Sequence, residues 1–127
     1  DLENQKNYNG WKAYCRSKLL NIFFTYSFKN KMKTKINSNC LHPGFVNSNF
    51  GNNNQNFYRF LINILKNLLA IGTDKAALSP LNLAINDDFK NVNGKYFFKL
   101  KEKKSSKESY NKELANQIWS KSLEYLK

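Results

Sequence analysis

The sequence contains few of the residues that build cross-linked or metal-binding proteins. It has only two cysteines and one histidine in 127 residues. Cys15 and Cys40 lie too far apart for the paired spacing of a zinc site, and two cysteines do not make a disulfide framework. No uncharged apolar run is long enough to cross a bilayer as a helix. We therefore expect no metal site, reduced thiols, and an intracellular location that is either cytoplasmic or membrane-associated.

Acidic residues are also scarce. Nine Asp and Glu stand against 21 Lys and Arg, which gives a formal net charge of +12. A charge of this size suits an anionic partner such as nucleic acid, a membrane surface or a cofactor. Lysine is spread over the whole sequence, however, and this uniform bias favours the simpler interpretation that the charge lies on solvated faces.

Apolar residues, by contrast, are abundant enough for a core. Hydrophobic residues make up 41% of the sequence and aromatic residues 15%, and the length suffices for one compact domain. The first residue is Asp1, and we expect the chain to be part of a longer protein.

Apolar periodicity in the first third predicts a helix followed by a strand. Apolar residues recur at three- and four-residue steps over about 11–30, and lysines crowd the end of this segment, where cations suit the helix dipole. The more polar segment 35–41 is predicted to be a short strand, which Pro43 and Gly44 end.

The middle of the sequence predicts two helices. An Asn-rich loop at 47–56 precedes an apolar stripe that indicates an amphipathic helix over about 57–69. Gly72 ends this pattern, and Thr73 is predicted to be the N-cap of a second helix that reaches about Asn86.

The last third predicts a strand and a closing helix. Asn93-Gly94 marks a turn before a short strand at 96–98. A charged linker is expected over 99–109, and a helix over about 111–126. The alternation of helices and strands indicates an α/β fold with a parallel sheet. Because two strands cannot form such a sheet alone, we expect the sheet to be incomplete in this chain.

One segment carries a pair of reactive side chains. Tyr14 and Lys18 are four residues apart on the first predicted helix and therefore share a face. A tyrosine ionises near pH ~10, too high for a base at neutral pH, and a neighbouring ammonium stabilises the phenolate form. Such a pair can move a proton on or off a carbinol oxygen. The spacing alone is unspecific, since a solvent-facing tyrosine with a lysine beside it fits equally well.

A second segment, Leu41 to Val46, follows the first predicted strand. Its Pro43-Gly44 turn exposes backbone groups at the edge where open α/β sheets bind ligands. His42, the single histidine, has no partner that would make it a catalytic base or a metal ligand, so a positional or core role is favoured.

Taken in order, these segments resemble the short-chain dehydrogenase/reductase superfamily, and within it the retinol-dehydrogenase-like group. The resemblance rests on Ala13 to Leu19, the Leu41 to Val46 turn, the Gly94-Lys95-Tyr96-Phe97 strand and Ile118-Trp119 in the closing helix. It covers nearly the whole chain. It implies that residues 1–127 are the C-terminal part of a single Rossmann-like domain, in which helices cover a doubly wound parallel sheet in three α/β/α layers.

The resemblance implies an oxidoreductase that interconverts an alcohol and a ketone or aldehyde by hydride transfer. The implied cofactor is NADP(H), with NAD(H) left open. Tyr14 would be the acid/base at the substrate oxygen, and Lys18 would assist it and bind the nicotinamide ribose.

The same resemblance assigns the remaining binding residues. Pro43, Gly44 and Val46 would line the nicotinamide, and Ser48 would offer a hydroxyl to the cofactor where the family usually has Thr. Apolar residues after the turn would contact a small alcohol or carbonyl substrate, expected to be hydrophobic: Phe45, Phe57, Phe60, Leu61 and Ile64.

Several parts of such an enzyme do not occur in this sequence. The glycine-rich phosphate turn, the catalytic Asn and the catalytic Ser lie upstream of the tyrosine in this family. We therefore expect the intact protein to be about twice as long and the 127 residues to be inactive alone.

Two other interpretations stay open. In one, the chain is a non-enzymatic basic module that binds nucleic acid or an anionic membrane surface, using its charge and the 57–69 helix. In the other, it is an inactive relative that keeps the fold. The dehydrogenase interpretation predicts no nucleic-acid partner, and it leaves room for peripheral membrane contact and for a homo-oligomer.

Overall fold

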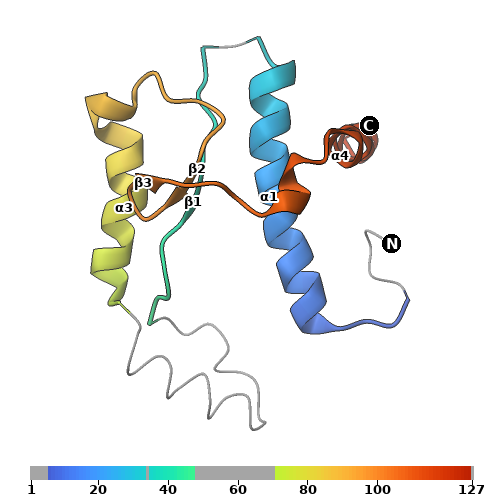
Figure 1. The fold of residues 1–127 in the computed structure, drawn as a ribbon, viewed down its shortest axis with the longest axis horizontal. Coiled ribbons are helices and arrows are strands. Elements are labelled where there is room, and N and C mark those ends of the chain that lie inside the picture. Colours follow the sequence, from blue (N-terminus) through green and yellow to red (C-terminus); the bar gives the residue numbers. More distant parts are fainter. Residues whose placement is uncertain (1–5, 34, 48–70, 127) are drawn as a thin grey trace, which may run out of the picture. The chain divides into compact units, whose positions relative to one another are not determined.

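The computed structural model describes residues 6–33, 35–47 and 71–126, and Figure 1 shows the course of the chain. The elements follow in the order α1 (Gly10–Lys31), β1 (Cys40–His42), α3 (Thr73–Ile85), η1 (Asp87–Phe89), β2 (Tyr96–Phe98), β3 (Lys101–Glu102), η2 (Lys107–Tyr110) and α4 (Lys112–Glu124). The predicted amphipathic helix at 57–69 lies outside the described residues, as does nearly all of the predicted loop at 47–56.

The chain divides into two compact units. The first comprises Asp1–Cys40, Val92–Tyr96 and Lys103–Lys127, and it holds α1, η2 and α4. The second comprises Leu41–Asn91 and Phe97–Glu102, and it holds α3, η1 and β3.

Helix α1 begins and ends where local chemistry favours it. The Asn9 side chain accepts a hydrogen bond from Lys12 N at 3.0 Å and so caps the first turn. Lys29 and Lys31 lie in the last turn, next to the negative end of the helix dipole. The predicted helix at about 11–30 is confirmed. Phe23, with 1% of its surface exposed, is the largest fully buried side chain among the described residues.

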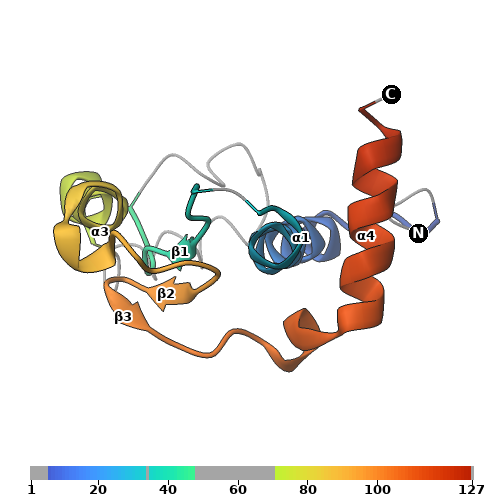
Figure 2. The ribbon, with the colours of Figure 1, turned by 90° about the horizontal axis from the view of Figure 1, so that it is seen from above.

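Helix α4 packs across α1 in the first unit, as Figures 1 and 2 show. Ile118 is the buried residue of α4, and Trp119 stacks on Phe24 of α1 with ring centroids 5.9 Å apart. The predicted closing helix is confirmed. Leu123 and Leu126 of the same apolar pattern do not join the core, because they are 47% and 82% exposed.

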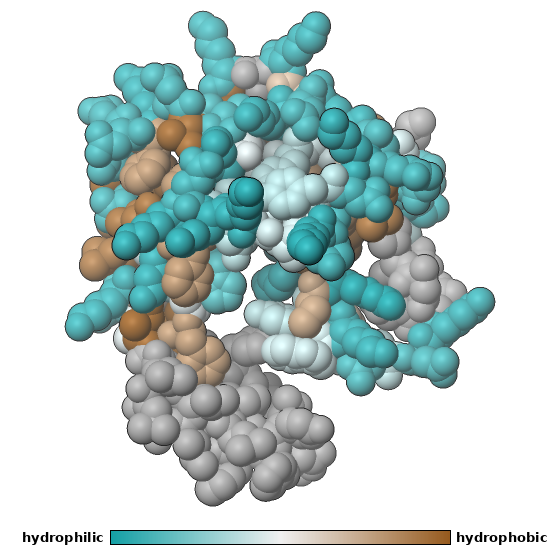
Figure 3. Space-filling model, viewed as in Figure 1, coloured by the Kyte–Doolittle hydropathy of each residue, from teal (hydrophilic) through white to brown (hydrophobic). Residues whose placement is uncertain are grey.

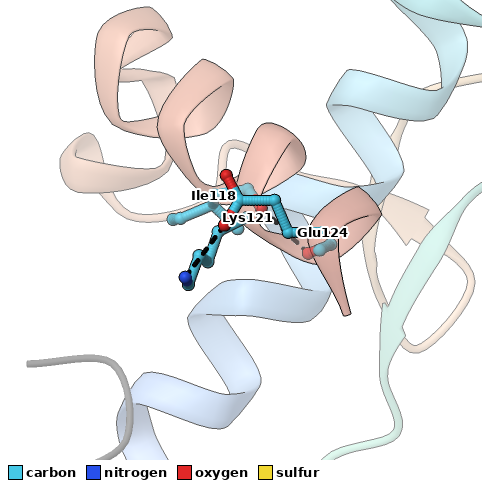
Figure 4. A network of polar contacts seen from close by, with 4 residues as sticks. Ile118, Lys121 and Glu124 are labelled. Carbon is cyan, nitrogen blue, oxygen red and sulfur yellow. Dashed lines mark hydrogen bonds and ion pairs between the residues drawn. The ribbon is translucent and has the colours of Figure 1, made fainter. Parts of the chain in front are cut away.

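The remaining polar contacts of α4 are local. The Asn111 side chain accepts from Leu114 N at 3.0 Å and caps the helix. Figure 4 shows Lys121 Nζ donating to Glu124 Oε2 at 2.9 Å, one turn further along the same helix. Both of these charged side chains are well exposed, so the pair contributes less than about 1 kcal/mol.

A polar network joins α1 to the turn η2. The Tyr26 hydroxyl lies 2.8 Å from Ser105 Oγ, which lies 2.6 Å from Ser109 Oγ. Ser105 N donates to the Tyr110 hydroxyl at 3.2 Å, and the Tyr110 ring stacks on Tyr26 with centroids 5.6 Å apart. Burial raises the pKa of Tyr26 to about 12. The network therefore fixes the segment 105–110 against the helix that carries Tyr14.

The strands form a three-stranded sheet in the order β1-β2-β3. Gly94 N donates to Ser38 O, Cys40 N to Lys95 O, and Lys99 N to His42 O, so β1 and β2 advance in the same direction. Strand β3 pairs antiparallel with β2, with Phe97 opposite Glu102 and Phe98 opposite Lys101. The described sheet is thus mixed rather than wholly parallel as predicted.

The predicted strand at 35–41 is mostly wrong, since only Cys40 to His42 adopt strand pairing. The residues before it are held by side-chain bonds instead. The Asn39 amide donates to Val92 O at 2.7 Å and accepts from Lys95 N at 3.0 Å, and Ser38 N donates to Asn93 Oδ1 at 2.9 Å. Over these residues, hydrogen bonds that join the Asn39 and Asn93 side chains to backbone groups take the place of most of the backbone hydrogen bonds of a strand ladder.

The predicted turn at Asn93-Gly94 and the strand after it are confirmed. Gly94 has φ +67, and a Cβ at this position would collide with the Lys29 side chain. The predicted linker at 99–109 is wrong in part, because it contains β3 and η2.

Helix α3 continues through Pro80 to Ile85, close to the predicted end. Thr73 is its first residue rather than its N-cap, which is Gly72. Its buried residues are Ala76 and Ser79, whereas Leu78, Leu81 and Ile85 are more than half exposed. Figure 3 shows brown hydrophobic patches over this helix among the teal hydrophilic surface. None of the helices in the described part of the chain has the length and apolar character needed to cross a membrane.

The buried ring of Phe23 gives a test of the first unit's core. Phe23→Ala should lower the free energy of unfolding by about 3–5 kcal/mol, because it leaves a cavity in a packed interior. The matched control is Phe24→Ala at the next residue, which is 52% exposed. It should cost about 1 kcal/mol through the lost stacking on Trp119. Equal losses in denaturant titrations would show that Phe23 is not a core residue.

Tyr26 gives a test at alkaline pH. Its pKa is raised to about 12 in the folded state, so an unfolded chain releases this proton earlier, near pH ~10. The stability that Tyr26 contributes is therefore complete below pH ~10 and lost as pH rises to about 12. Tyr26→Phe should flatten this part of the stability–pH curve, whereas Tyr8→Phe, at a tyrosine that is 74% exposed, should leave it unchanged. Identical curves for wild type and Tyr26→Phe would contradict the network.

Candidate active site

Tyr14 and Lys18 share one face of α1, as their spacing predicted. The Lys18 ammonium nitrogen lies 5.2 Å from the centroid of the Tyr14 ring. The Trp11 ring also stacks on Tyr14, with centroids 5.8 Å apart and planes inclined by 28°. Tyr14 is half-buried, and Lys18 is exposed. The phenol therefore contacts an indole one turn before it and a cation one turn after it.

The Pro43-Gly44 turn begins where β1 ends, at His42. Gly44 has φ +95, a conformation that residues with a side chain rarely adopt. A Cβ at Gly44 would also lie only 3.2 Å from Lys99 Cε. The positive φ favours glycine at this position, and the close approach of the flexible Lys99 side chain adds a smaller steric cost to any larger residue.

Val46 lies in a short parallel bridge with Ile71. The bridge uses the neighbours of Val46: Ile71 N donates to Phe45 O, and Asn47 N donates to Ile71 O, each at 2.9 Å. In this pattern the N–H and C=O of Val46 itself point to the opposite side of the segment. Val46 therefore presents one backbone donor and one acceptor together, and Phe45 beside it is 45% exposed.

His42 has a structural role in the turn, in line with the positional role favoured from the sequence. Its Nδ1 accepts a hydrogen bond from Gly44 N at 3.0 Å. Its ring packs against Phe98 with centroids 5.6 Å apart. Sequence reasoning missed Phe98 and Lys99 as neighbours of the turn, and no pattern in the Lys-rich stretch that follows β2 singles them out.

Other reactive groups are few in the described part of the chain. Cys40 is poorly suited to act as a nucleophile, because burial raises the pKa of its thiol and Sγ contacts Lys95 O at 3.6 Å. Within residues 6–33, 35–47 and 71–126, His, Cys, Asp and Glu side chains form no group of three that could hold a metal ion.

The predicted site residues fall into three sets. Tyr14 and Lys18 lie together in the first unit, and Pro43, Gly44, Phe45 and Val46 lie together in the second. The convergence of these two sets on one concavity stays a prediction. The remaining predicted residues lie outside the described part of the chain: Ser48, Phe57, Phe60, Leu61 and Ile64.

Comparison with known proteins finds relatives that match nearly all of this chain. Mouse retinol dehydrogenase 13 is 33% identical over 92% of the chain and 36% of its own length. Human polyprenol dehydrogenase is 31% identical over 98% of the chain and 38% of its own length. Bovine retinol dehydrogenase 12 is 32% identical over 99% of the chain and 40% of its own length. The chain thus spans about two fifths of these relatives, and no protein-family model matches it.

The turn conformation can be tested by substitution. Gly44→Ala should lower the free energy of unfolding by about 1–2 kcal/mol, because φ is positive there. Adding Lys99→Ala should remove the steric part of this cost and leave the backbone part. The control is Gly72→Ala, where an added Cβ meets no atom of the described residues within 4 Å. A Gly44→Ala variant as stable as Gly72→Ala in denaturant titrations would rule out the described turn.

Proposed function

We infer that this chain, a relative of the short-chain dehydrogenases/reductases of the retinol-dehydrogenase-like group, carries the acid/base pair of an oxidoreductase. The proposed reaction interconverts an alcohol and a ketone or aldehyde with NADP(H), and NAD(H) remains an alternative. The observation that carries the proposal is the placement of the Lys18 ammonium over the Tyr14 ring on one helix face. It combines with the similarity to dehydrogenases over more than nine tenths of the chain.

The residues of the second unit suit a nicotinamide ring. A carboxamide has one donor group and one acceptor oxygen, and Val46 presents a matching C=O and N–H on one side of its segment. When bound, the nicotinamide supplies or accepts the hydride. Pro43, Gly44 and Val46 would hold it, and Lys18 would bind its ribose.

In the proposed mechanism Tyr14 moves the proton. During carbonyl reduction its hydroxyl donates a proton to the developing alkoxide, and during alcohol oxidation the phenolate takes the proton back. An ammonium close to a phenol stabilises the ionised form that this cycle passes through. Trp11 and Lys18 both contact the ring and so limit its movement away from the substrate oxygen.

The proposed substrate is a hydrophobic alcohol or its aldehyde. Two of the relatives are named for retinol and one for polyprenol, both long apolar alcohols. Phe45 is exposed directly after the Pro43-Gly44 turn and offers an apolar contact there. The segment 57–69, with Phe57, Phe60, Leu61 and Ile64, is proposed to cover the same substrate.

Tyr14→Phe tests the proposal in the full-length protein that carries this chain. The variant keeps the ring but loses the transferable proton, so turnover should fall by about 10²–10⁴-fold while the melting temperature holds. Tyr8→Phe, at an exposed tyrosine of the same unit, is the matched control and should keep full activity. A Tyr14→Phe variant with near-normal carbonyl reduction would exclude the acid/base role. A wild-type protein with no activity on retinal or a polyprenal, and no NADPH binding, would favour an inactive relative.

Lys18→Ala separates the two tasks assigned to the lysine. It should lower turnover, because Lys18 is proposed to assist Tyr14. It should also raise the dissociation constant of NADPH, because Lys18 is proposed to contact the ribose. Arg16→Ala, at another exposed cation of α1, should change neither quantity. Equal effects of the two substitutions would show that the net positive charge of α1, and not the position of Lys18, determines turnover and NADPH affinity.

A further inference from the structure

We propose that His42 is a positioning residue for the coenzyme, because its Nδ1 sets the conformation of the Pro43-Gly44 turn by accepting the Gly44 amide proton. This inference rests on the proposed function, since the turn is taken to face the nicotinamide. His42 itself is not assigned any contact with coenzyme or substrate.

The hydrogen bond closes the turn on itself. Gly44 N lies 3.0 Å from His42 Nδ1, two residues back along the chain. Because Nδ1 accepts this proton, the ring proton of the neutral imidazole sits on Nε2. The Gly44 amide takes no part in the sheet: Lys99 N donates to His42 O at 2.8 Å, and Gly44 N donates to the His42 side chain. Without the imidazole, nothing else in the described residues holds this amide at the positive φ of Gly44.

The imidazole is itself held in place from β2. Its ring packs against Phe98 at 5.6 Å, with planes inclined by 36°. The Lys99 ammonium lies 5.8 Å from the centroid of the same Phe98 ring, and the Lys99 stem passes over Gly44. Lys99 has φ +56, so its own backbone turns sharply at this point. His42, Gly44, Phe98 and Lys99 therefore form one cluster, with the hydrogen bond at its centre, and all four belong to the second unit.

The consequence concerns the backbone groups that follow the turn. Pro43 lies inside the turn that the hydrogen bond closes, and Val46 comes two residues after Gly44, so a change at Gly44 displaces the groups proposed to meet the nicotinamide. A small displacement of binding groups lowers the affinity for a ligand strongly when that affinity depends on their exact placement. His42 should therefore act through coenzyme affinity more than through the stability of the domain.

Two nearly isosteric substitutions separate the hydrogen bond from the size of the side chain. Asparagine can accept a hydrogen bond from the amide two residues ahead, as it does in Asx turns, whereas leucine has the same shape and no acceptor. In the full-length protein, His42→Leu should raise the dissociation constant of NADPH at least about tenfold, measured by fluorescence titration. His42→Asn should stay within about threefold of wild type.

Hydrogen exchange of the Gly44 amide gives a readout that does not depend on the coenzyme. It should be slow in wild type and His42→Asn and fast in His42→Leu. If His42→Leu fails to fold, Phe98→Leu serves instead: it keeps the imidazole but removes the ring that supports it, and it should raise the NADPH dissociation constant about threefold.

The outcomes distinguish this inference from the proposed function. Suppose first that the wild-type protein binds NADPH. The role of His42 is then overturned if His42→Leu has unchanged NADPH affinity, or if His42→Asn loses as much NADPH affinity as His42→Leu does. Either result leaves the proposed function standing. A folded wild-type protein that binds neither NADPH nor NADH overturns both. A lower melting temperature in His42→Leu with unchanged NADPH affinity shows a structural role alone and also overturns the inference.

Discussion

The parallel pairing of β1 with β2 is the constraint on which the candidate cofactor edge depends. Because the two strands advance in the same direction, they end at the same edge of the sheet. The turn after β1 therefore lies beside the turn after β2. This is why His42 and Gly44, from one turn, contact Phe98 and Lys99 from the other. An antiparallel pairing of the same two strands would separate these four residues.

The sequence predicted the parts of the fold that depend on local periodicity and on turn chemistry. The long helix at α1, the end of β1 before Pro43 and the turn at Gly94 are confirmed. The prediction of a strand over 35–41 was mostly wrong, because the Asn39 side chain forms hydrogen bonds with the backbone of Val92 and Lys95. The pattern of apolar residues in the sequence gives no sign of such side-chain bonds. The short strand β3 was missed because a two-residue strand among lysines carries no apolar alternation.

The candidate site was predictable to a similar degree. The Tyr14–Lys18 contact follows from helical spacing alone, and the resemblance to the short-chain dehydrogenases/reductases is confirmed by relatives of about 30% identity along nearly the whole chain. The stacking of Trp11 on Tyr14 and the packing of Phe98 on His42 could not be predicted, since they depend on side-chain direction and on strand pairing. Each of these contacts fixes the ring of a residue to which a role is proposed, Tyr14 in the first case and His42 in the second.

In the proposed reaction, Tyr14 and Lys18 on α1 move the proton and the turn after β1 binds the coenzyme. Transfer of a label from the coenzyme to the substrate tests this reaction most directly. The full-length protein would be given NADPH deuterated at C4 of the nicotinamide, together with a long-chain aldehyde, and the product analysed by mass spectrometry. The account predicts one deuterium on the carbinol carbon of the alcohol. An alcohol product without deuterium, or no product from a protein shown to bind NADPH, would contradict it.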